Sequence, residues 1–366
     1  MGTHTISVLA GDGIGPEVMP VAIAVLDAAA EPHGVTFEWQ ERPWGTDFYR
    51  THGRMMPTDA IETMATTDAV FLGAVGDPAV ADVVTLWGML IPIRREFDQY
   101  VNLRPVRSFR GIASSLAGDP EIDLVIVREN VEGEYSTVGG RSYEGTPYEA
   151  AFQQAIFTRR GIERIARYAV KVARERGGRL VSATKSNGIV HTMPFWDEVV
   201  AEVAAASQIR LESVLIDALA ARMVRSPQSI DVIVASNLFG DILSDLAAGA
   251  VGSIGIAPSA NLNPEKRHPS MFEPVHGSAP DIAGRGIANP IGQIWAGAMM
   301  LRHLGHGEIA DRVEAAFTAV VERGIVTQDL GGTASTAEVG SAIVRELSGT
   351  AGPAVALTSQ ATEKID

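Results

Sequence analysis

The sequence predicts an α/β protein, because short apolar runs alternate with longer amphipathic stretches along most of its length. The first such unit is an apolar run at 5–10 followed by a helical pattern at 16–30. From residue 292 onward the patterns are mostly helical. At 366 residues the chain is long enough for about two domains, and no long linker separates them. The chain is therefore expected to pass between the two domains more than once.

Each predicted element rests on a local pattern. Strands are expected at the short apolar runs, namely residues 5–10, 69–73, 123–127, 179–183, 210–215 and 230–235. Helices are expected at the longer amphipathic patterns, namely residues 16–30, 158–175, 292–304, 309–323 and 336–347. Pro16 lies at the start of the first helix, where its missing N–H leaves no helical hydrogen bond unmade. The small, polar tail after residue 349 is expected to be mobile.

Net charge and cysteine content exclude several classes of function. Lys and Arg number 30 and Asp and Glu 44, which gives a net charge of −14. Because such a chain repels phosphate backbones and anionic lipids, neither nucleic acid nor a membrane is expected as a partner. The absence of cysteine removes disulfides, zinc–thiolate sites and cysteine nucleophiles. The N-terminal apolar run is too short for a secretory signal and the uncharged stretch 246–264 is often interrupted, so a cytoplasmic protein is expected.

A glycine-rich turn follows the first predicted strand, with the sequence Gly-Asp-Gly-Ile-Gly-Pro at residues 11–16. Such a turn at a helix N-terminus can approach an anion or a cofactor closely. The spacing differs from the dinucleotide-binding fingerprint, because the third glycine comes two residues after the second. Taken alone, the turn is more often structural than functional.

Two aspartates lie four residues apart in the segment that follows the strand predicted at 230–235. On a helix, Asp241 and Asp245 share one face, where two like charges repel each other. A divalent cation would reverse that cost, since Mg²⁺ and Mn²⁺ prefer carboxylate oxygens. The start of a helix after a strand is also where α/β proteins place their sites. A metal site and a solvated acidic face remain comparable interpretations.

Arginines gather near the ends of predicted strands. Arg94 follows an apolar run, Arg104 opens a strand-like segment, and Arg128 ends the strand at 123–127. Arginine recognises carboxylates through two parallel hydrogen bonds, so these residues could line a site for a di-acid in an otherwise acidic chain. For any one of them, a surface ion pair is the commoner outcome.

Two further segments carry candidate groups. Lys185 follows the strand at 179–183 and could act as a general base, although a single lysine there is more often exposed or structural. The segment 273–284 is a loop by composition, rich in Gly, Ser and Pro. Its Asp281 could bond a ribose hydroxyl and would repel a 2′-phosphate. His276 alone is more often a satisfied structural histidine.

Together these segments resemble the metal-dependent β-decarboxylating dehydrogenases, the family of isocitrate, 3-isopropylmalate and tartrate/D-malate dehydrogenases. The resemblance extends from residue 11 to about residue 305, with the motifs in the same order. The segments most similar to the tartrate/D-malate branch are IRREFDQYVNLRPVR at 93–107, VRENVEGEYSTVGGR at 127–141, TKSNGI at 184–189 with TMPFWDE at 192–198, and SNLFGDILSDL at 236–246 with GIAPSANLNPE at 255–265. No single segment is specific, but the set is.

The resemblance implies an isopropylmalate-dehydrogenase-like fold, with a twisted mixed sheet divided between two domains, and not a Rossmann fold. Residues 1–100 and 253–366 would form the cofactor-binding domain. Residues 101–252 would form the substrate and dimerisation domain, with an arm at 136–154 that embraces a partner. The protein would be a homodimer with active sites shared between its subunits.

The resemblance also implies a role for each candidate residue. Arg94, Arg104 and Arg128 would hold the substrate carboxylates, and Leu90 would line the substrate pocket. Asp241 and Asp245 would ligate Mg²⁺ or Mn²⁺, with Asp217 reaching in from the partner subunit. Lys185, also from the partner, would take the hydroxyl proton, and Tyr135 would protonate the enol after decarboxylation. The cofactor-binding set would be Ile14, Asn187, His276, Gly277, Ser278, Ala279, Asp281 and Asn289.

The cofactor expected from this set is NAD, because NADP-linked relatives carry a basic residue where Asp281 stands. A monovalent cation such as K⁺ is a further candidate cofactor. The expected reaction is the oxidative decarboxylation of D-malate to pyruvate and CO₂, with tartrate as a second substrate. Isocitrate finds no ionic partner for its third carboxylate near Trp87, and the indole should shrink a pocket for isopropylmalate, although 3-isopropylmalate dehydrogenase stays the alternative.

Two observations qualify this expectation. The tartrate/D-malate branch usually shows Pro-Asp-His where this chain has Ala-Asp-Val at 81–83, and the lost imidazole weakens the argument for tartrate more than that for D-malate. A two-domain binding or regulatory subunit without turnover is a different class that shares the fold. Such paralogues usually lose a metal aspartate, the lysine or the tyrosine, and this chain retains all of them.

Overall fold

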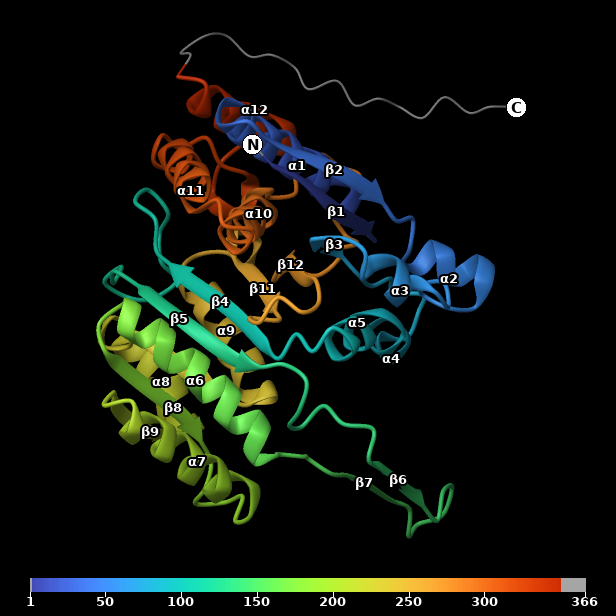
Figure 1. Ribbon diagram of the computed structural model, residues 1–366, viewed down its shortest axis with the longest axis vertical. Helices are drawn as coiled ribbons and strands as arrows, with labels where there is room; N and C mark the ends of the chain where they lie inside the picture. The colour runs from blue at the N-terminus through green and yellow to red at the C-terminus, as the bar shows by residue number, and fades with distance from the viewer. Residues whose placement is uncertain (1, 350–366) are drawn as a thin grey trace.

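The computed structural model describes residues 2–349, and ten strands in this range form one twisted mixed sheet (Figure 1). The strand order is β2-β1-β3-β12-β11-β4-β5-β10-β8-β9. The strands of the sheet are β1 (Gly2–Gly11), β2 (Val35–Glu41), β3 (Ala69–Ala74), β4 (Val101–Arg107), β5 (Asp123–Glu129), β8 (Arg179–Thr184), β9 (Arg210–Leu215), β10 (Val232–Ala235), β11 (Pro258–Leu262) and β12 (Ser270–Pro274). The mixed sheet confirms the fold class expected from the sequence.

Helices cover both faces of this sheet. The longer helices are α1 (Gly15–Ala30), α6 (Arg159–Glu175), α7 (Thr192–Ala206), α8 (Ile216–Arg225), α9 (Asn237–Ala250), α10 (Ile291–His303), α11 (Gly307–Glu322) and α12 (Thr336–Leu347). The shorter helices are α2 (Thr46–His52), α3 (Ala60–Met64), α4 (Asp82–Thr85) and α5 (Ile91–Glu96), with a π-helical turn at Leu86–Leu90 between the last two. Helices α1, α10, α11 and α12 gather at one end of the molecule, and α6, α7, α8 and α9 at the other (Figure 1).

Regular apolar periodicity explains the elements that the sequence predicts best. Helix α6 buries a stripe that includes Ile162, Ile165 and Ala169, and it begins at Thr158, whose hydroxyl accepts a hydrogen bond from the Gly161 N–H. Helix α12 begins with a reciprocal capping box between Ser335 and Glu338. Every predicted strand and helix is found, with boundaries shifted by a few residues at most.

Strands β4 and β5, at the centre of the sheet, determine on which face the site lies. Strands β4 and β5 are antiparallel, with Arg104 opposite Ile126 and Asn102 opposite Arg128. Side chains alternate between the faces of a sheet, so Arg104 and Arg128 point to the same face. Helix α9 packs on that face, whereas α6 packs on the opposite face of β5 and β10.

Two strands from the C-terminal part of the chain lie between strands from its N-terminal part. Strands β11 and β12 lie between β3 and β4, so the segment 258–274 returns to the middle of the sheet. One detail of the sequence prediction is wrong here, because Glu273 and Pro274 end strand β12 and do not belong to the following loop. The division into 1–100 with 253–366 and 101–252 stays a prediction.

A two-stranded arm projects from the body of the molecule (Figure 1). Its strands β6 (Gly139–Ser142) and β7 (Ala150–Gln153) pair in antiparallel register. Three aromatic side chains of the arm, Tyr143, Tyr148 and Phe152, are exposed. The arm lies within the predicted range 136–154, and its contact with a partner stays a prediction.

Within residues 2–349, no helix is both long enough and apolar enough to cross a membrane. The tail predicted to be mobile lies outside the described residues.

Candidate active site

Three arginines, two aspartates and a tyrosine meet on one face of the sheet. The centre of this cluster is Asp241, on the second turn of α9. Its Oδ1 accepts hydrogen bonds from Arg128 Nη1 at 2.5 Å and Arg104 Nη1 at 3.2 Å. Its Oδ2 accepts a hydrogen bond from the Tyr135 hydroxyl at 2.8 Å. The sequence predicted these residues for one site, and the structure brings them together.

The second aspartate lies beside the first, as the i, i+4 spacing predicts. Asp245 Oδ1 is 3.4 Å from Arg104 Nη1, the same nitrogen that contacts Asp241, so both carboxylates converge on one point. The Asp245 side chain is 55% exposed, against 31% for Asp241. Two converging carboxylates, one of them open to solvent, are a donor set that fits a divalent cation needing further ligands.

Burial and charge set the protonation of this cluster. Burial, together with the charge of Arg104, lowers the pKa of Arg128 to about 10, and the guanidinium still carries its charge at neutral pH. Burial alone would raise the pKa of Asp241, but the charges of Arg128 and Arg104 hold it below its usual value. The Asp241 carboxylate is therefore ionised well below neutral pH.

Arg94 lies at the edge of the same cluster. Its Nη2 donates to Glu273 Oε1 at 2.8 Å, and both side chains are about nine-tenths buried. Its charge also helps to lower the pKa of Asp241. Glu273 Oε1 accepts a second hydrogen bond, from Asn261 Nδ2 on the neighbouring strand β11. The carboxylate that holds Arg94 is therefore itself held in place.

Tyr135 is held as a neutral phenol. Burial and the adjacent Asp241 charge raise the pKa of its hydroxyl, so the group keeps its proton at neutral pH. The Arg128 guanidinium lies 5.7 Å from the centre of the Tyr135 ring. A protonated phenol beside an ionised carboxylate suits the donor role that the sequence predicts.

The segment around Tyr135 is fixed by contacts that the sequence did not predict. Glu134 accepts hydrogen bonds from the Ser236 hydroxyl at 2.7 Å and from the Leu238 N–H at 3.0 Å, both at the N-terminus of α9. Arg95 Nη2 donates to the Tyr135 carbonyl oxygen at 2.7 Å. Glu134 thus ties the tyrosine segment to the helix that carries Asp241 and Asp245.

Removing this tie should impair turnover without removing a reacting group. In Glu134→Ala, the α9 N-terminus loses two acceptors, so we expect a loss of about 1 kcal/mol in the free energy of unfolding and a fall in kcat of roughly tenfold. Urea unfolding and steady-state kinetics measure these. Glu134→Gln keeps an acceptor for the Leu238 N–H and should recover most of the kcat. An unchanged kcat in Glu134→Ala would contradict the positioning role.

Lys185 pairs with Asp217, and no ion pair joins Lys185 to the cluster among residues 2–349. Lys185 Nζ donates to Asp217 Oδ1 at 2.7 Å, and both side chains are partly exposed. Among residues 2–349, no three acidic or histidine side chains gather to form a metal site, so Asp217 does not join Asp241 and Asp245 in the same chain. That the pair completes the site of a partner subunit stays a prediction.

The two loops predicted to bind the cofactor are in contact with each other. The Ile14 N–H donates to the Ser278 carbonyl oxygen at 2.9 Å, and Ile14 packs near Ala279. Gly13 has a positive φ, and a side chain there would collide with the Ser278 carbonyl oxygen. Buried Asp12 fixes the turn by accepting hydrogen bonds from the Thr46 and Gly76 N–H groups.

One atom of this loop pair lacks a partner. His276 is buried, its Nδ1 contacts the Gly277 carbonyl oxygen, and its Nε2 has no hydrogen-bond partner among the described residues. Burial lowers the pKa of His276, so the ring is neutral at pH 7. A side chain on Gly277 would have no atom within 4 Å of its Cβ, so there is open space beside this residue. An orphaned imidazole nitrogen next to open space fits a cofactor that supplies the missing hydrogen bond.

The remaining cofactor candidates differ in how they are held. Asn289 Nδ2 donates to Asp329 at 3.0 Å, and its Oδ1 accepts from the Ile291 N–H at the start of α10. Asp281 lies exposed on the loop, and Asn187 is exposed just after β8. Asn187 lies two residues after Lys185. Among the described residues, its side chain makes no hydrogen bond to either loop.

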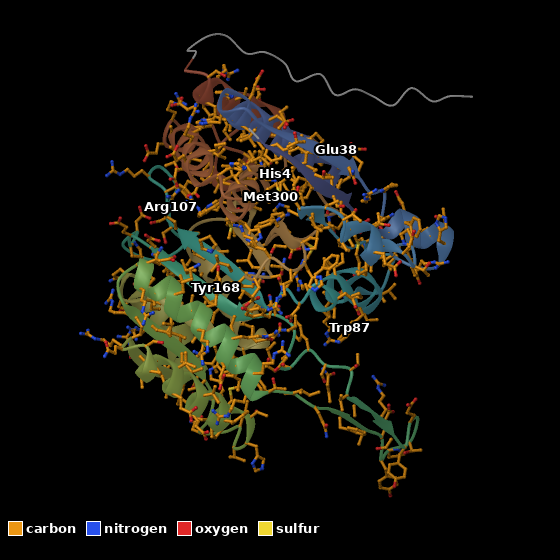
Figure 2. The ribbon with its side chains drawn as sticks, in the orientation of Figure 1. His4, Glu38, Trp87, Arg107, Tyr168 and Met300 are labelled. Carbon is orange, nitrogen blue, oxygen red and sulfur yellow. The ribbon has the colours of Figure 1, made fainter. Side chains whose placement is uncertain are left out.

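The pocket segment holds Leu90 and Trp87 in the π-helical turn at Leu86–Leu90, and the effect of Trp87 on the pocket stays a prediction. Leu90 is half-buried in the π-helical turn, as a lining residue should be. The centre of the Trp87 ring lies 5.1 Å from the Arg95 guanidinium carbon, in the α4–α5 region (Figure 2). Arg95 also holds the Tyr135 carbonyl, so Trp87 stacks on a residue that contacts the site. π-helical turns often mark functional segments.

Sequence reasoning missed four residues of the site: Arg95, Glu134, Asn237 and Glu273. Asn237 accepts two hydrogen bonds from Arg128, at 2.7 and 3.2 Å. The signal for Asn237 was available, because it lies four residues before Asp241 and so on the same helical face. The partners of Glu134 and Glu273 lie far away in the sequence, and no local pattern indicated them.

Comparisons with known proteins agree with this geometry. A family model described as isocitrate/isopropylmalate dehydrogenase matches residues 5–343. A probable tartrate dehydrogenase/decarboxylase of Bacillus subtilis (strain 168) is 52% identical over 350 residues, covering 95% of this chain and 99% of the relative. The D-malate dehydrogenase [decarboxylating] of Escherichia coli (strain K12) is 52% identical over 356 residues, covering 94% of this chain and 99% of the relative.

A solved structure is similar as well. The crystal structure of isocitrate dehydrogenase from Methylococcus capsulatus matches with a TM-score of 0.85 and 35% identity, covering 94% of this chain and 99% of that one. The family match and these relatives cover nearly all of the described residues, including every residue of the cluster around Asp241. The chain therefore belongs to the isocitrate/isopropylmalate dehydrogenase family.

Proposed function

We propose that this protein catalyses the NAD-dependent and divalent-metal-dependent oxidative decarboxylation of D-malate to pyruvate and CO₂, with tartrate as a slower substrate. The names of two relatives about half identical over nearly the whole chain support a small hydroxy di-acid as substrate. We also propose a cytoplasmic homodimer whose active sites are shared, with Mg²⁺ or Mn²⁺ as the metal and K⁺ as a candidate activator.

The charge balance of the cluster is the observation that carries this proposal. Three cations and three carboxylates meet there, and without ligand they neutralise one another through direct ion pairs: Arg94, Arg104, Arg128, Glu273, Asp241 and Asp245. A divalent cation alone or a dianion alone would unbalance this buried site, which is costly at low dielectric. A divalent cation and a dicarboxylate together add no net charge, so the site favours a metal-chelating di-acid.

Each residue of the cluster has a role in this reaction. Arg94, Arg104 and Arg128 bind the two substrate carboxylates and orient the hydroxyl-bearing carbon. Lys185 of the partner subunit takes the hydroxyl proton as a hydride leaves that carbon, and Tyr135 donates a proton to the enol that remains after CO₂ departs. Asp241 and Asp245 would hold the metal, and the loops at Ile14 and His276 would hold NAD. When bound, NAD accepts the hydride and the divalent cation stabilises the negative oxygen.

A substrate panel with the purified chain, Mn²⁺ and NAD tests the proposal. D-malate, the tartrate isomers, 3-isopropylmalate and isocitrate are compared by NADH absorbance, and pyruvate is assayed separately. We expect the highest kcat/KM with D-malate and an equal yield of NADH and pyruvate. A higher kcat/KM with 3-isopropylmalate would reject the proposed substrate, and no NADH from any member would indicate a binding subunit.

The choice of cofactor follows from the charge at Asp281. An exposed carboxylate next to the adenosine ribose would repel the 2′-phosphate of NADP, so we expect kcat/KM to favour NAD by roughly a hundredfold or more. Asp281→Ser should narrow this preference mainly by improving NADP. Asp311→Ser, at an exposed carboxylate in α11, serves as the control for the loss of one charge. Comparable values for the two cofactors in the unaltered protein would contradict the assignment of Asp281.

A further inference from the structure

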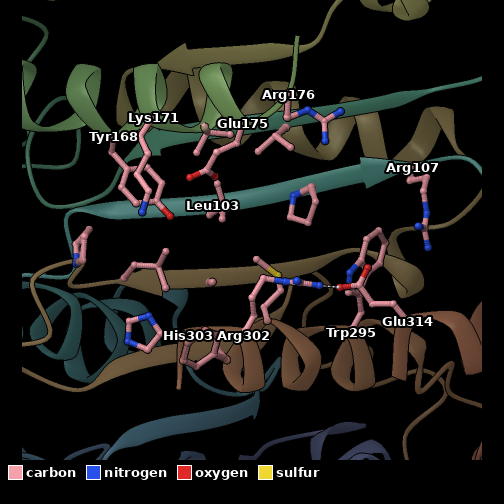
Figure 3. Close-up of a pocket in the computed structure, with 18 of the residues that line it drawn as sticks. Leu103, Arg107, Tyr168, Lys171, Glu175, Arg176, Trp295, Arg302, His303 and Glu314 are labelled. Atoms are coloured by element: carbon pink, nitrogen blue, oxygen red, sulfur yellow. Dashed lines mark hydrogen bonds and ion pairs between the residues drawn. The ribbon is translucent and has the colours of Figure 1, made fainter. Parts of the chain in front are cut away.

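A cavity lies on the face of the sheet opposite the cluster around Asp241. It has a volume of about 660 Å³ and lies between α6 on one side and α10 and α11 on the other (Figure 3). Its floor is formed by alternate residues of β4, including Leu103 and Pro105, with Val125 of β5 beside them. We refer to this cavity as the rear groove. Its volume is typical of sites for small organic ligands.

The rear groove presents cations without carboxylate partners in a chain whose net charge is −14. Five cationic and three acidic side chains line it: Arg107, Lys171, Arg176, Lys266, Arg302, Asp123, Glu175 and Glu314. Arg176 is paired with Asp123 and Asp231, and Arg302 with Glu314 and Asp311. The remaining cations are Arg107, Lys171 and Lys266, and none of them forms an ion pair with a carboxylate among residues 2–349. Glu175 is the one acidic lining residue that forms no ion pair within the same range.

The unpaired cations lie on different walls. Lys171 descends from α6 beside Tyr168, while Arg107 lies at the far end of β4 near Trp295 (Figure 3). The Arg107 guanidinium lies 5.4 Å from the centre of the Trp295 ring and donates to the Thr318 hydroxyl. Apolar groups between these cations include Leu103, Pro105 and the Trp295 ring, and the Glu175 carboxylate lies on the α6 wall beside them. This combination suits a ligand with a flat apolar body and an anionic group.

The rear groove shares its strands with the active site. Leu103, Pro105 and Arg107 face the groove, whereas Arg104 between them faces Asp241. A ligand that bridges α6 and α10 would therefore restrict the strand that carries a substrate-binding arginine. Coupling requires that such a ligand fits one arrangement of these elements better than another.

We propose that the rear groove binds an organic anion with a flat apolar body, and that its occupancy changes the affinity of the active site for its dicarboxylate. The binding of the anion is argued from the lining of the groove and does not depend on the proposed reaction. The change in affinity rests on the function proposed above.

The probe is 8-anilinonaphthalene-1-sulfonate, a flat aromatic sulfonate whose fluorescence rises on binding. It is titrated into the full-length protein in the presence of saturating NAD, which occupies the cofactor loops. We expect one saturable site per chain. Lys171→Met should weaken binding by roughly fivefold, and Val172→Trp, which fills the groove from α6, should abolish it. Arg160→Met, which removes an exposed charge of the same helix outside the groove, is the matched control.

Each outcome decides part of the proposal. Equal weakening by Lys171→Met and Arg160→Met, displacement of the probe by NAD, or unaltered binding in Val172→Trp would overturn the site. Because Lys171 is a surface residue, its variant keeps the test valid should Val172→Trp fail to fold. A saturating probe should change the KM for D-malate at least twofold in the unaltered protein, and in Lys171→Met the same change should require about fivefold more probe. An unchanged KM would overturn the coupling, and absence of D-malate turnover would reject the proposed function while the binding result stands.

Discussion

Asp241→Asn should abolish turnover and destabilise the protein, whereas Asp245→Asn should abolish turnover alone. Both substitutions remove a carboxylate from the proposed metal site, so we expect kcat/KM to fall at least about a thousandfold in each. The stability effects differ because the two carboxylates differ in their contacts. Asp241 pairs with the fully buried Arg128 at 2.5 Å. Asp245 is half exposed, and its contact with Arg104 is longer, at 3.4 Å.

The loss of Asp241 leaves Arg128 buried without its closest counter-charge. We expect a decrease of about 2 kcal/mol in the free energy of unfolding for Asp241→Asn, and of less than about 0.5 kcal/mol for Asp245→Asn. Urea unfolding in the presence of a chelator measures both without interference from bound metal. Equal stability of the two variants would show that the ion pairs to Asp241 contribute nothing to the fold.

The stability difference should also depend on pH in a defined direction. The folded-state pKa of Asp241 is lowered, so its stabilising charge is fully present above the unfolded value of about 3.9 and is lost as the pH falls through the folded value. Unfolding curves of the unaltered protein and of Asp241→Asn should therefore differ at pH 7 and approach each other in strong acid. A difference that grows toward low pH would contradict the assigned protonation.

The predicted elements that were confirmed share one property, which is a regular apolar pattern. Strands β11 and β12 were missed because polar residues interrupt their buried apolar positions, namely Ser259, Asn261, Ser270 and Glu273. These groups are buried because distant partners satisfy them. Asn102 Nδ2, for example, donates to Ser259 Oγ at 2.7 Å across more than 150 residues of chain. A local pattern cannot indicate a partner at that separation, so such strands resemble loops in the sequence.

The site was predictable to the extent that its geometry is local. The shared face of Asp241 and Asp245 follows from helical spacing and is confirmed by their common contact with Arg104. That Arg104 and Arg128 both meet Asp241 depends on the register of β4 against β5 and on where α9 crosses the sheet. Neither can be derived from spacing, and the resemblance to known dehydrogenases supplied that grouping before the structure did.

Intersubunit complementation tests the part of the site that one chain does not contain. Lys185→Met and Tyr135→Phe should each lower kcat by roughly a hundredfold to ten-thousandfold, because each removes a proton-transfer group. In the proposed dimer, each active site combines Tyr135 of one subunit with Lys185 of the other. A heterodimer of the two variants then has one site with both groups intact and one site with neither.

Such heterodimers are obtained by co-expressing the two variants with different affinity tags and purifying through both. We expect them to regain about half of the turnover of the unaltered dimer, although both parent homodimers are nearly inactive. The control is a heterodimer of Lys185→Met with a chain carrying both substitutions, in which neither site is complete. If Lys185 and Tyr135 served the same site from one chain, the first heterodimer would stay as inactive as its parents. Recovery in the first heterodimer and not in the control therefore requires that one site combine Lys185 and Tyr135 from different subunits.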